Sequence, residues 1–227
     1  MICIACTTVI TVDYFRFTDF DGKTQAMQNK VDVLEKYSDR LYHLYMGDSR
    51  IYIVPGLKNL HIGGSVMKAM NLVKRHWPSI KYVYYLQHDF YFTKPIDHKA
   101  LVGEMDRNEK INYVRFPKRH GGISRFCGDA QQVLYNRTIP DGNNSTEQLV
   151  LYPTNAYSDN NHLVRLKWNM EVIASLVKLN RAPEDPLQSR ANNGCMKVGR
   201  PDDIHGLYLY HEMCIGHLDG RHTQSTP

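Results

Sequence analysis

Strand-like and helix-like segments alternate along the first half of the chain, and this order constrains the fold more than any other feature. Residues 1–15 (MICIACTTVITVDYF) are apolar and β-branched, which predicts a strand. Residues 24–41 carry apolar side chains at helical spacing, and residues 65–77 form a second helix pattern that Pro78 stops. Because such alternation favours a parallel or mixed sheet covered by helices, the sequence predicts an α/β fold.

Shorter patterns complete the predicted element list. We expect strands at residues 40–48 (RLYHLYMGD), 51–55 (IYIVP) and 81–92 (KYVYYLQHDFYF), long loops over 119–161, a helix at 163–179 (LVRLKWNMEVIASLVKL), and a last strand with a polar exit within 206–221 (GLYLYHEMCIGHLDGR). The chain shows no repeat, no low-complexity tract and no clean linker, so the sequence predicts one domain over residues 1–227.

Composition excludes several classes of protein. The formal net charge is +5, but no run of Lys and Arg approaches a nucleic-acid-binding tail. No apolar run reaches the roughly 20 residues of a membrane span, and no signal peptide precedes the first strand. Five scattered cysteines do not form a disulfide framework. The sequence therefore predicts a soluble cytoplasmic protein with neither nucleic-acid partner nor membrane span, whose basic surface suits an anionic small molecule.

A polar step, Gln87-His88-Asp89, interrupts the aromatic strand at residues 81–92. Ligand sites of open α/β sheets lie beyond the carboxyl ends of their strands, which is where these residues fall. An aspartate there is a hard oxygen ligand for Mg²⁺ or Mn²⁺, and a neighbouring imidazole favours Mn²⁺. The alternative is a strand end with two surface polar residues.

Paired glycines, Gly63 and Gly64, stand just before the second predicted helix, and Lys68 lies one turn into it. Glycines let a backbone approach a phosphate-bearing ligand, and a helix N-terminus favours negative charge. The segment predicts a diphosphate contact; the alternative is an ordinary loop.

Two adjacent carboxylates, Glu184 and Asp185, lie between Pro183 and Pro186. Prolines stiffen the segment, and a rigid carboxylate beside an anionic substrate suits a general base. The alternative is a solvated acidic loop.

The segment GHLDGRH near the end of the chain offers His217 as a metal ligand and Arg221 as a phosphate contact. The metal hypothesis requires His217 to return to the neighbourhood of Asp89. Otherwise it is an ordinary histidine at a strand end.

In this order the motifs resemble those of glycosyltransferases of the GT-A type, close to the family 2-like enzymes. The chain is similar to a group of uncharacterised microbial and viral members over roughly residues 45–222, in the segments HIGGSVMKAMNLV, YYLQHDFYF, NNHLVRLKW, PEDPLQ and YHE…GHLDGR. The acidic triplet of such enzymes is here Gln87-His88-Asp89, which leaves one carboxylate. The first strand and turn, which hold the nucleoside base in such enzymes, are not evident before MICIACTTV.

The resemblance implies a GT-A-like mixed sheet in a single domain, with residues 1–118 as the nucleotide-sugar-binding half and 119–227 as the acceptor and catalytic half. It implies metal-dependent transfer of a sugar, with inversion, from a nucleoside-diphosphate sugar to a hydroxyl of a glycan, lipid or protein. The alternatives are a nucleotidyltransferase, which releases pyrophosphate, and a non-catalytic glycan- or nucleotide-binding module.

The resemblance also implies roles for single residues. Asp89 and His217 hold Mg²⁺ or Mn²⁺, and Asp185, or Glu184 in its place, takes the proton of the acceptor hydroxyl. The predicted nucleotide-sugar contacts are Gly63, Gly64, Lys68, His88, Asp89 and Arg221. The residues expected to shape the donor-sugar or acceptor side are Asp159, His162, Arg165 and Trp168.

Overall fold

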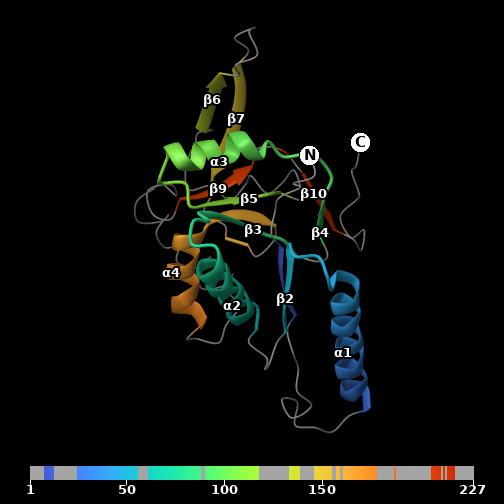
Figure 1. Ribbon diagram of the computed structural model, residues 1–227. Coiled ribbons are helices and arrows are strands. Elements are labelled where there is room, and N and C mark those ends of the chain that lie inside the picture. The colour runs from blue at the N-terminus through green and yellow to red at the C-terminus, as the bar shows by residue number, and fades with distance from the viewer. Residues whose placement is uncertain are drawn as a thin grey trace. The chain divides into compact units, whose positions relative to one another are not determined.

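The computed structural model describes about three fifths of the chain (Figure 1). The described residues are 8–12, 25–55, 61–87, 90–117, 133–138, 146–154, 157–158, 161–177, 187, 206–210, 212 and 214–217. The chain divides into two compact units, Met1–Ile80 with Met170–Pro183 and Lys81–Asn169 with Glu184–Pro227. Each unit is described below by itself, and the single domain expected over residues 1–227 stays a prediction.

The first unit is built on a parallel pair of strands. Strand β1 (Thr8–Val12) pairs in parallel with β2 (Ile51–Pro55), so that Ile10 lies opposite Ile53. A parallel pair needs a long crossover, and helix α1 (Gln25–Tyr45) lies within it and contacts β2. Helix α2 (His61–His76) contacts β1.

The second unit contains a six-stranded mixed sheet in the order β3-β8-β5-β9-β7-β6. Its strands are β3 (Tyr82–Tyr85), β5 (Tyr113–Arg115), β6 (Val133–Thr138), β7 (Thr146–Pro153), β8 (His162–Arg165) and β9 (Leu207–Tyr210). Strand β8 runs antiparallel to both β3 and β5, and β5 runs parallel to β9. Strands β3, β5 and β9 therefore end at the same edge of the sheet, which we call the carboxyl edge.

Helix α3 (His98–Arg107) covers one face of this sheet. Asp97 caps its N-terminus by accepting a hydrogen bond from the backbone N–H of Ala100 (2.8 Å). The helix buries Leu101 and Met105 completely against the strands, in a core that includes Phe116. The remaining members of this core are Ile111, Val114, Leu149, Leu151, Leu163, Tyr208, Tyr210, Cys214 and Ile215.

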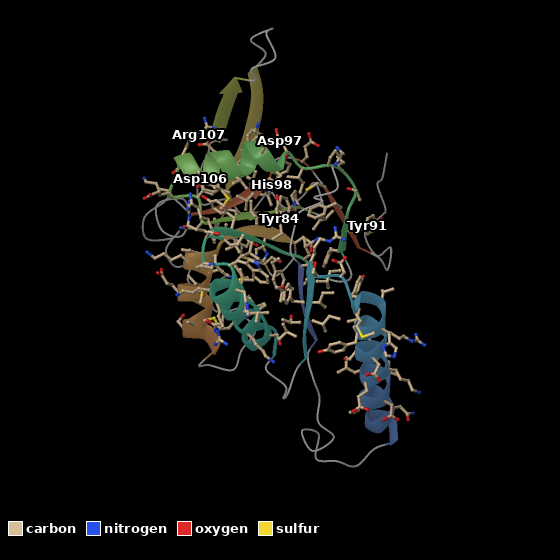
Figure 2. The ribbon with its side chains drawn as sticks, viewed as in Figure 1. Tyr84, Tyr91, Asp97, His98, Asp106 and Arg107 are labelled. Atoms are coloured by element: carbon tan, nitrogen blue, oxygen red, sulfur yellow. The ribbon has the colours of Figure 1, made fainter. Side chains whose placement is uncertain are left out.

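Side chains from the sheet and α3 meet at this interface (Figure 2). The Tyr84 hydroxyl lies 3.0 Å from Nδ1 of His98, and the Tyr84 ring stacks on Phe116 at 5.9 Å. Burial raises the pKa of the Tyr84 hydroxyl. This face of the sheet is occupied by the packing of α3.

A second, two-stranded sheet joins distant parts of the second unit. Strand β4 (Phe90–Phe92) pairs antiparallel with β10 (Ile215–His217). The backbone N–H of Thr93 donates to the carbonyl of Cys214 (2.8 Å), and that of Cys214 donates to the carbonyl of Pro117 (3.3 Å). The pair is thereby tied to the residues that follow β5.

The structure confirms the α/β fold class, and the expected strand at residues 51–55 is β2. The strand expected at 40–48 is wrong, because α1 continues to Tyr45. Leu41 and Tyr45, four residues apart, are half-buried while the three residues between them are exposed, which is a helical rather than an alternating pattern. Gly47, at a φ of 111°, then stands where glycine is favoured after a helix end.

Three other expectations need correction. Residues 163–179 do not form one helix, since Leu163–Arg165 belong to β8 and helix α4 (Leu166–Val177) follows directly. Residues 81–92 form two strands, β3 and β4, separated at the polar step. The segment 206–221 likewise contains β9 and β10, and residues 119–161, expected as loops, contain the β6–β7 hairpin.

Over the part of the chain that the structure describes, no helix combines the length and apolar character needed to cross a membrane.

Candidate functional site

Buried polar side chains gather at the carboxyl edge of the six-stranded sheet. Asn161 is 1% exposed and His162 is 2% exposed, at the start of β8, which pairs with the ends of β3 and β5. Ser158 is buried as well. Buried polar groups are costly unless they are bonded, so a cluster of them at a sheet edge is a candidate site.

Asn161 connects the ends of two strands. Its side-chain Oδ1 accepts a hydrogen bond from the backbone N–H of Gln87 (2.8 Å), which lies two residues beyond β3. Its backbone carbonyl accepts from the N–H of Phe116 (3.0 Å), directly after β5. Asn161 therefore fixes the backbone from which the Gln87-His88-Asp89 step begins.

His162 is enclosed by tyrosine rings. The Tyr85 ring stacks on the imidazole at 4.9 Å with an interplanar angle of 17°, and the Tyr113 ring lies at 4.6 Å. The Tyr113 hydroxyl donates to the Ser158 carbonyl (2.6 Å) and accepts from the Ser158 N–H (3.3 Å). His162 thus lies at the carboxyl edge, inside a packed aromatic support that holds the segment before β8 in place.

The register of β4 and β10 places His217 beside the polar step. His217 lies directly opposite Phe90, and Phe90 is the residue that follows Asp89. The N–H of Phe90 donates to the carbonyl of Gln87 (3.2 Å), so the residues flanking His88 and Asp89 are hydrogen-bonded to each other. His88, Asp89 and the side chain of His217 lie outside the described residues. The backbone nevertheless brings together two segments that are more than 120 residues apart in the sequence.

The structure places Arg165 away from this edge. Arg165 pairs with Tyr82, at the beginning of β3, while His162 pairs with Tyr85 at its end. The Arg165 guanidinium donates to the carbonyls of Met105 (2.6 Å) and Ile111 (3.2 Å), and it lies 5.2 Å from the centre of the Tyr82 ring. These contacts hold the C-terminal end of α3 and the turn after it against the sheet, so Arg165 is left out of the proposed site.

Some of the remaining predicted site residues lie in described helices, and the others lie outside the described part of the chain. Gly63 and Gly64 are buried within the first turn of α2, because this helix begins at His61, four residues earlier than expected; Lys68 is half-buried on the same helix. Trp168 is half-buried in the first turn of α4. The predicted residues that lie outside the described part of the chain are Asp159, Glu184, Asp185 and Arg221.

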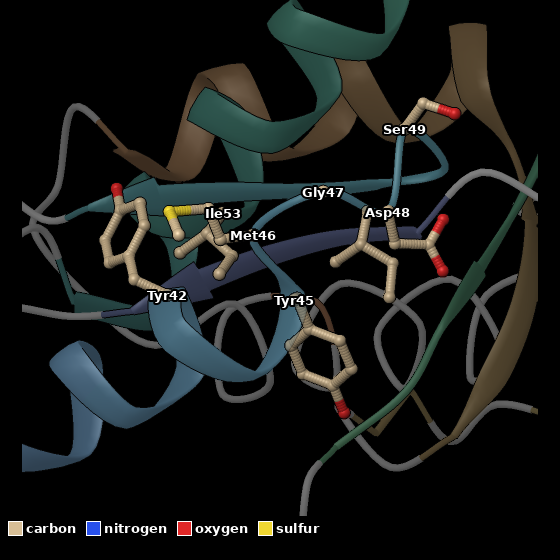
Figure 3. Close-up of a pocket in the computed structure, with 8 residues that line it drawn as sticks. Tyr42, Tyr45, Met46, Gly47, Asp48, Ser49 and Ile53 are labelled. Carbon is tan, nitrogen blue, oxygen red and sulfur yellow. The ribbon is translucent and has the colours of Figure 1, made fainter.

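An open pocket of about 370 Å³ lies in the first unit (Figure 3). Its lining residues are Tyr42, Tyr45, Met46, Gly47, Asp48, Ser49, Ile51 and Ile53. The one carboxylate among them, Asp48, is already bonded to Arg50 (2.7 Å), which lowers its pKa to about 2. None of the predicted site residues lines this pocket, so it does not serve as the candidate site.

Sequence reasoning missed two residues at the carboxyl edge, Arg115 and Asn161. Arg115 is the last residue of β5 and lies opposite His162. In the sequence, Arg115 is a single polar residue between apolar ones and Asn161 is one of several residues in the polar run at 158–162, and only the strand register shows that their backbones lie close together.

Within the described residues, no three His, Cys, Asp or Glu side chains form a group that could hold a metal ion. The comparisons with known proteins do not assign the site either: no protein-family model and no curated protein matches the chain.

Proposed function

We propose that the protein is a metal-dependent glycosyltransferase that moves a sugar from a nucleoside-diphosphate sugar to an acceptor hydroxyl of a glycan, lipid or protein in the cytoplasm. The observation that carries the proposal is the β4–β10 register, which sets His217 opposite the residue after Asp89. This is the return of the C-terminal segment that a shared metal site requires. The proposal is also supported by the position of the polar step beyond the carboxyl end of β3.

The proposal is supported by the backbone spacing, which allows a metal ion to be shared by Asp89 and His217. Residues directly opposite in an antiparallel pair have Cα atoms ~4.5–5.5 Å apart, and consecutive Cα atoms are ~3.8 Å apart. The Cα atoms of Asp89 and His217 are therefore at most about 9 Å apart, which a carboxylate and an imidazole can bridge through one ion. One carboxylate oxygen and one imidazole nitrogen suit Mn²⁺, and Mg²⁺ less well. Such an ion would neutralise charge on the diphosphate leaving group.

Residues of the protein would position the Asp89 carboxylate and accept the proton of the acceptor hydroxyl. Asn161 and the tyrosines around His162 fix the strand end from which Asp89 follows, so that the carboxylate starts from a rigid support. Asp185, held between two prolines, is the proposed base for the acceptor hydroxyl, and Glu184 is the alternative.

The donor can be identified by thermal denaturation with nucleoside diphosphates and nucleotide sugars, each with and without Mn²⁺. A ligand present at ~100 times its Kd stabilises the folded state by ~2.7 kcal/mol. We expect one nucleotide class to raise Tm only with Mn²⁺, and Asp89→Ala to abolish the effect. Asp39→Ala, on the exposed part of α1, is the matched control. An Asp89→Ala protein that binds Mn²⁺ and nucleotide like the wild type would contradict the metal assignment.

The released product separates the proposed reaction from its rivals. Incubation with the stabilising nucleotide sugar and acceptor candidates should release a nucleoside diphosphate. Release of pyrophosphate in a nucleotidyl transfer assay would instead indicate a nucleotidyltransferase. Binding of the donor without any turnover would indicate a binding module.

The proposed base has its own test. Asp185→Asn is nearly isosteric but cannot accept a proton, so transfer should fall by ~10²–10⁴ while donor binding is unchanged. If Glu184→Gln loses activity instead, the two neighbours exchange roles. If both variants transfer at the wild-type rate, this site model has no base.

A further inference from the structure

Positive charge is concentrated in one segment of the chain. Residues 49–88 contain six Lys and Arg and no Asp or Glu, whereas the formal net charge of the whole chain is +5. Three consecutive basic residues of this segment, Lys74, Arg75 and His76, are exposed at the C-terminal end of α2. Basic side chains stabilise the last turn of a helix through its dipole, and here they also make the end of α2 a positively charged surface.

A tight turn follows these basic residues. The N–H of Trp77 donates to the carbonyl of Val73 (2.8 Å), and the N–H of Ile80 donates to the carbonyl of Trp77 (3.0 Å). Pro78 therefore occupies the second position of a four-residue turn, where its fixed φ is favoured. Since Pro78 has no N–H and that of Ile80 is bonded within the turn, neither residue brings an unbonded N–H to an apolar medium.

Apolar and aromatic side chains are accessible at this turn. Ile80 is 42% exposed, and Trp77 is half-buried. The Tyr52 ring of β2, which is 38% exposed, meets the Trp77 ring edge-on, with the ring centres 4.9 Å apart and the planes at 79°. Because Ile51 and Ile53 line the pocket beside α1, Tyr52 points to the opposite face of β2. The aromatic pair thus holds the turn against that face.

The basic residues and the apolar turn follow one another along the helix axis. At a rise of 1.5 Å per residue, Arg75 and Lys74 precede Trp77 by ~3 and ~5 Å. At the surface of a lipid bilayer, Lys and Arg lie among the headgroups, while Trp and apolar side chains lie at the boundary with the acyl chains. The order of residues at the end of α2 matches this order of layers.

We propose that the end of α2 is a membrane-surface site for anionic lipids. Lys74 and Arg75 contact the lipid headgroups, and Trp77 and Ile80 enter the boundary with the acyl chains. A short apolar contact or two positive charges alone attach a protein weakly, and the combination of the two signals strengthens the attachment. The site goes beyond the proposed sugar transfer, since lipid binding here requires neither the metal ion nor the sugar donor.

A single-stranded nucleic acid is the rival partner, because it also combines phosphate charge with groups that stack on aromatic rings. Such a ligand would use Lys74, Arg75 and the two aromatic rings, but it gives no role to the exposed Ile80. An isoleucine presented by a tight turn beside a tryptophan favours the lipid surface.

Flotation of the full chain with lipid vesicles tests the proposal. The vesicles are made of phosphatidylcholine alone or of equimolar phosphatidylcholine and phosphatidylserine, and we expect binding only with phosphatidylserine. Lys74→Gln/Arg75→Gln should weaken binding by ~10- to 30-fold, which corresponds to about fivefold for each charge. Ile80→Ser keeps both charges and should weaken binding by ~3- to 10-fold.

Helix α1 offers matched controls in the same unit. Lys36→Gln/Arg40→Gln removes two charges from exposed positions, and Val33→Ser removes a β-branched apolar side chain that is 66% exposed. Both variants should bind the vesicles like the wild type. Thermal denaturation without lipid checks that every variant is folded.

Fluorescence places the contact at the turn itself. The chain has two tryptophans, so Trp168→Phe leaves Trp77 as the only one. Phosphatidylserine vesicles should shift its emission to shorter wavelengths, and lipids brominated in the acyl chain should quench it. The shift should disappear at the same lipid concentration when Lys74→Gln/Arg75→Gln is added.

Each outcome supports or rejects the site. No binding of the wild type to phosphatidylserine vesicles, unchanged Trp77 emission on binding, or equal losses in the α1 controls would overturn it. Binding of a single-stranded RNA oligonucleotide that depends on Lys74 and Arg75 but not on Ile80, without vesicle binding, would assign the surface to nucleic acid. Vesicle binding without sugar transfer would reject the glycosyltransferase alone, and sugar transfer without vesicle binding would reject the membrane site alone.

Discussion

The contact between Gly216 and Tyr91 offers a direct test of the β4–β10 register. The two residues lie opposite each other, and a Cβ added to Gly216 would lie 2.7 Å from Cζ of the tyrosine ring and 2.8 Å from its hydroxyl oxygen. Ordinary van der Waals contact begins at 3.4 Å, so in Gly216→Ala the ring or strand β10 has to move by ~0.7 Å. The atoms that meet the added Cβ belong to the far end of the Tyr91 side chain, so the ring has to turn away from β10.

The magnitude follows from how much of Tyr91 is buried. The ring is 44% exposed, so complete expulsion would expose ~100 Å² of apolar surface, worth ~2.5 kcal/mol at 25 cal/mol per Å². We expect Gly216→Ala to lower the free energy of unfolding by ~1–2.5 kcal/mol. In Tyr91→Ala/Gly216→Ala the clash is absent, so the double variant should be as stable as Tyr91→Ala alone, within ~0.5 kcal/mol.

Urea denaturation of the four proteins forms a double-mutant cycle. We predict a coupling energy of at least ~1 kcal/mol between the two positions. Displacement of β10 also moves His217, so Gly216→Ala should weaken Mn²⁺ binding and the double variant should restore it. Effects of the two substitutions that add within ~0.3 kcal/mol would refute the register on which the metal site depends.

Three further predictions test the rest of the fold. Gly206, at a φ of 62°, leaves no room for a Cβ beside the Lys110 carbonyl, so Gly206→Ala should destabilise the protein by ~2 kcal/mol or more in urea. Gly103 lies inside α3, and no atom lies within 4 Å of a Cβ added there, so Gly103→Ala should stabilise the protein by ~0.5–1 kcal/mol in the same assay. Burial raises the pKa of the Glu104 carboxyl above its value in the unfolded chain. The contribution of Glu104 to stability therefore falls as pH rises from the unfolded pKa through the raised one. The Tm difference between wild type and Glu104→Gln, followed from pH ~4 to ~7, should move in favour of the variant as pH increases.

Some of the fold could be predicted because local pattern and final structure agree. The apolar β-branched segment at 51–55 is a strand, and the helical spacing of apolar residues after Gln25 is a helix. The polar step at 87–89 does end a strand, because its side chains interrupt the aromatic run.

Other elements are decided by contacts that are distant in sequence. Leu163 and Val164 are both buried, one on each face of β8, and a short apolar run of this kind reads equally well as the start of a helix. Pairing with β3 on one side and β5 on the other makes it a strand. The β6–β7 hairpin could not be predicted either, because the turn-forming residues between its strands made the whole region resemble a loop.

The candidate site likewise combines residues that the sequence can indicate with residues that only the pairing of distant strands brings together. Asp89 and His217 could be proposed from residue type and position, but the pairing of His217 with Phe90, the residue after Asp89, is a β4–β10 contact that no local pattern specifies. Arg115 and Asn161 could not be singled out at all, because an arginine or an asparagine next to a strand is common. Their unsatisfied donors become visible only when the neighbouring strands are in place.

Pulsed electron paramagnetic resonance of bound Mn²⁺ can determine whether Asp89 and His217 bind one metal ion. The measurement uses the wild type with Mn²⁺ and the nucleoside diphosphate that stabilises it. We expect modulation from a directly coordinated imidazole ¹⁴N, which His217→Ala abolishes and His43→Ala, at an exposed position of α1, leaves unchanged. Asp89→Ala should lose the bound ion altogether. A ¹⁴N signal that persists in His217→Ala, or a wild-type Mn²⁺ signal without coordinated nitrogen, would contradict the shared site.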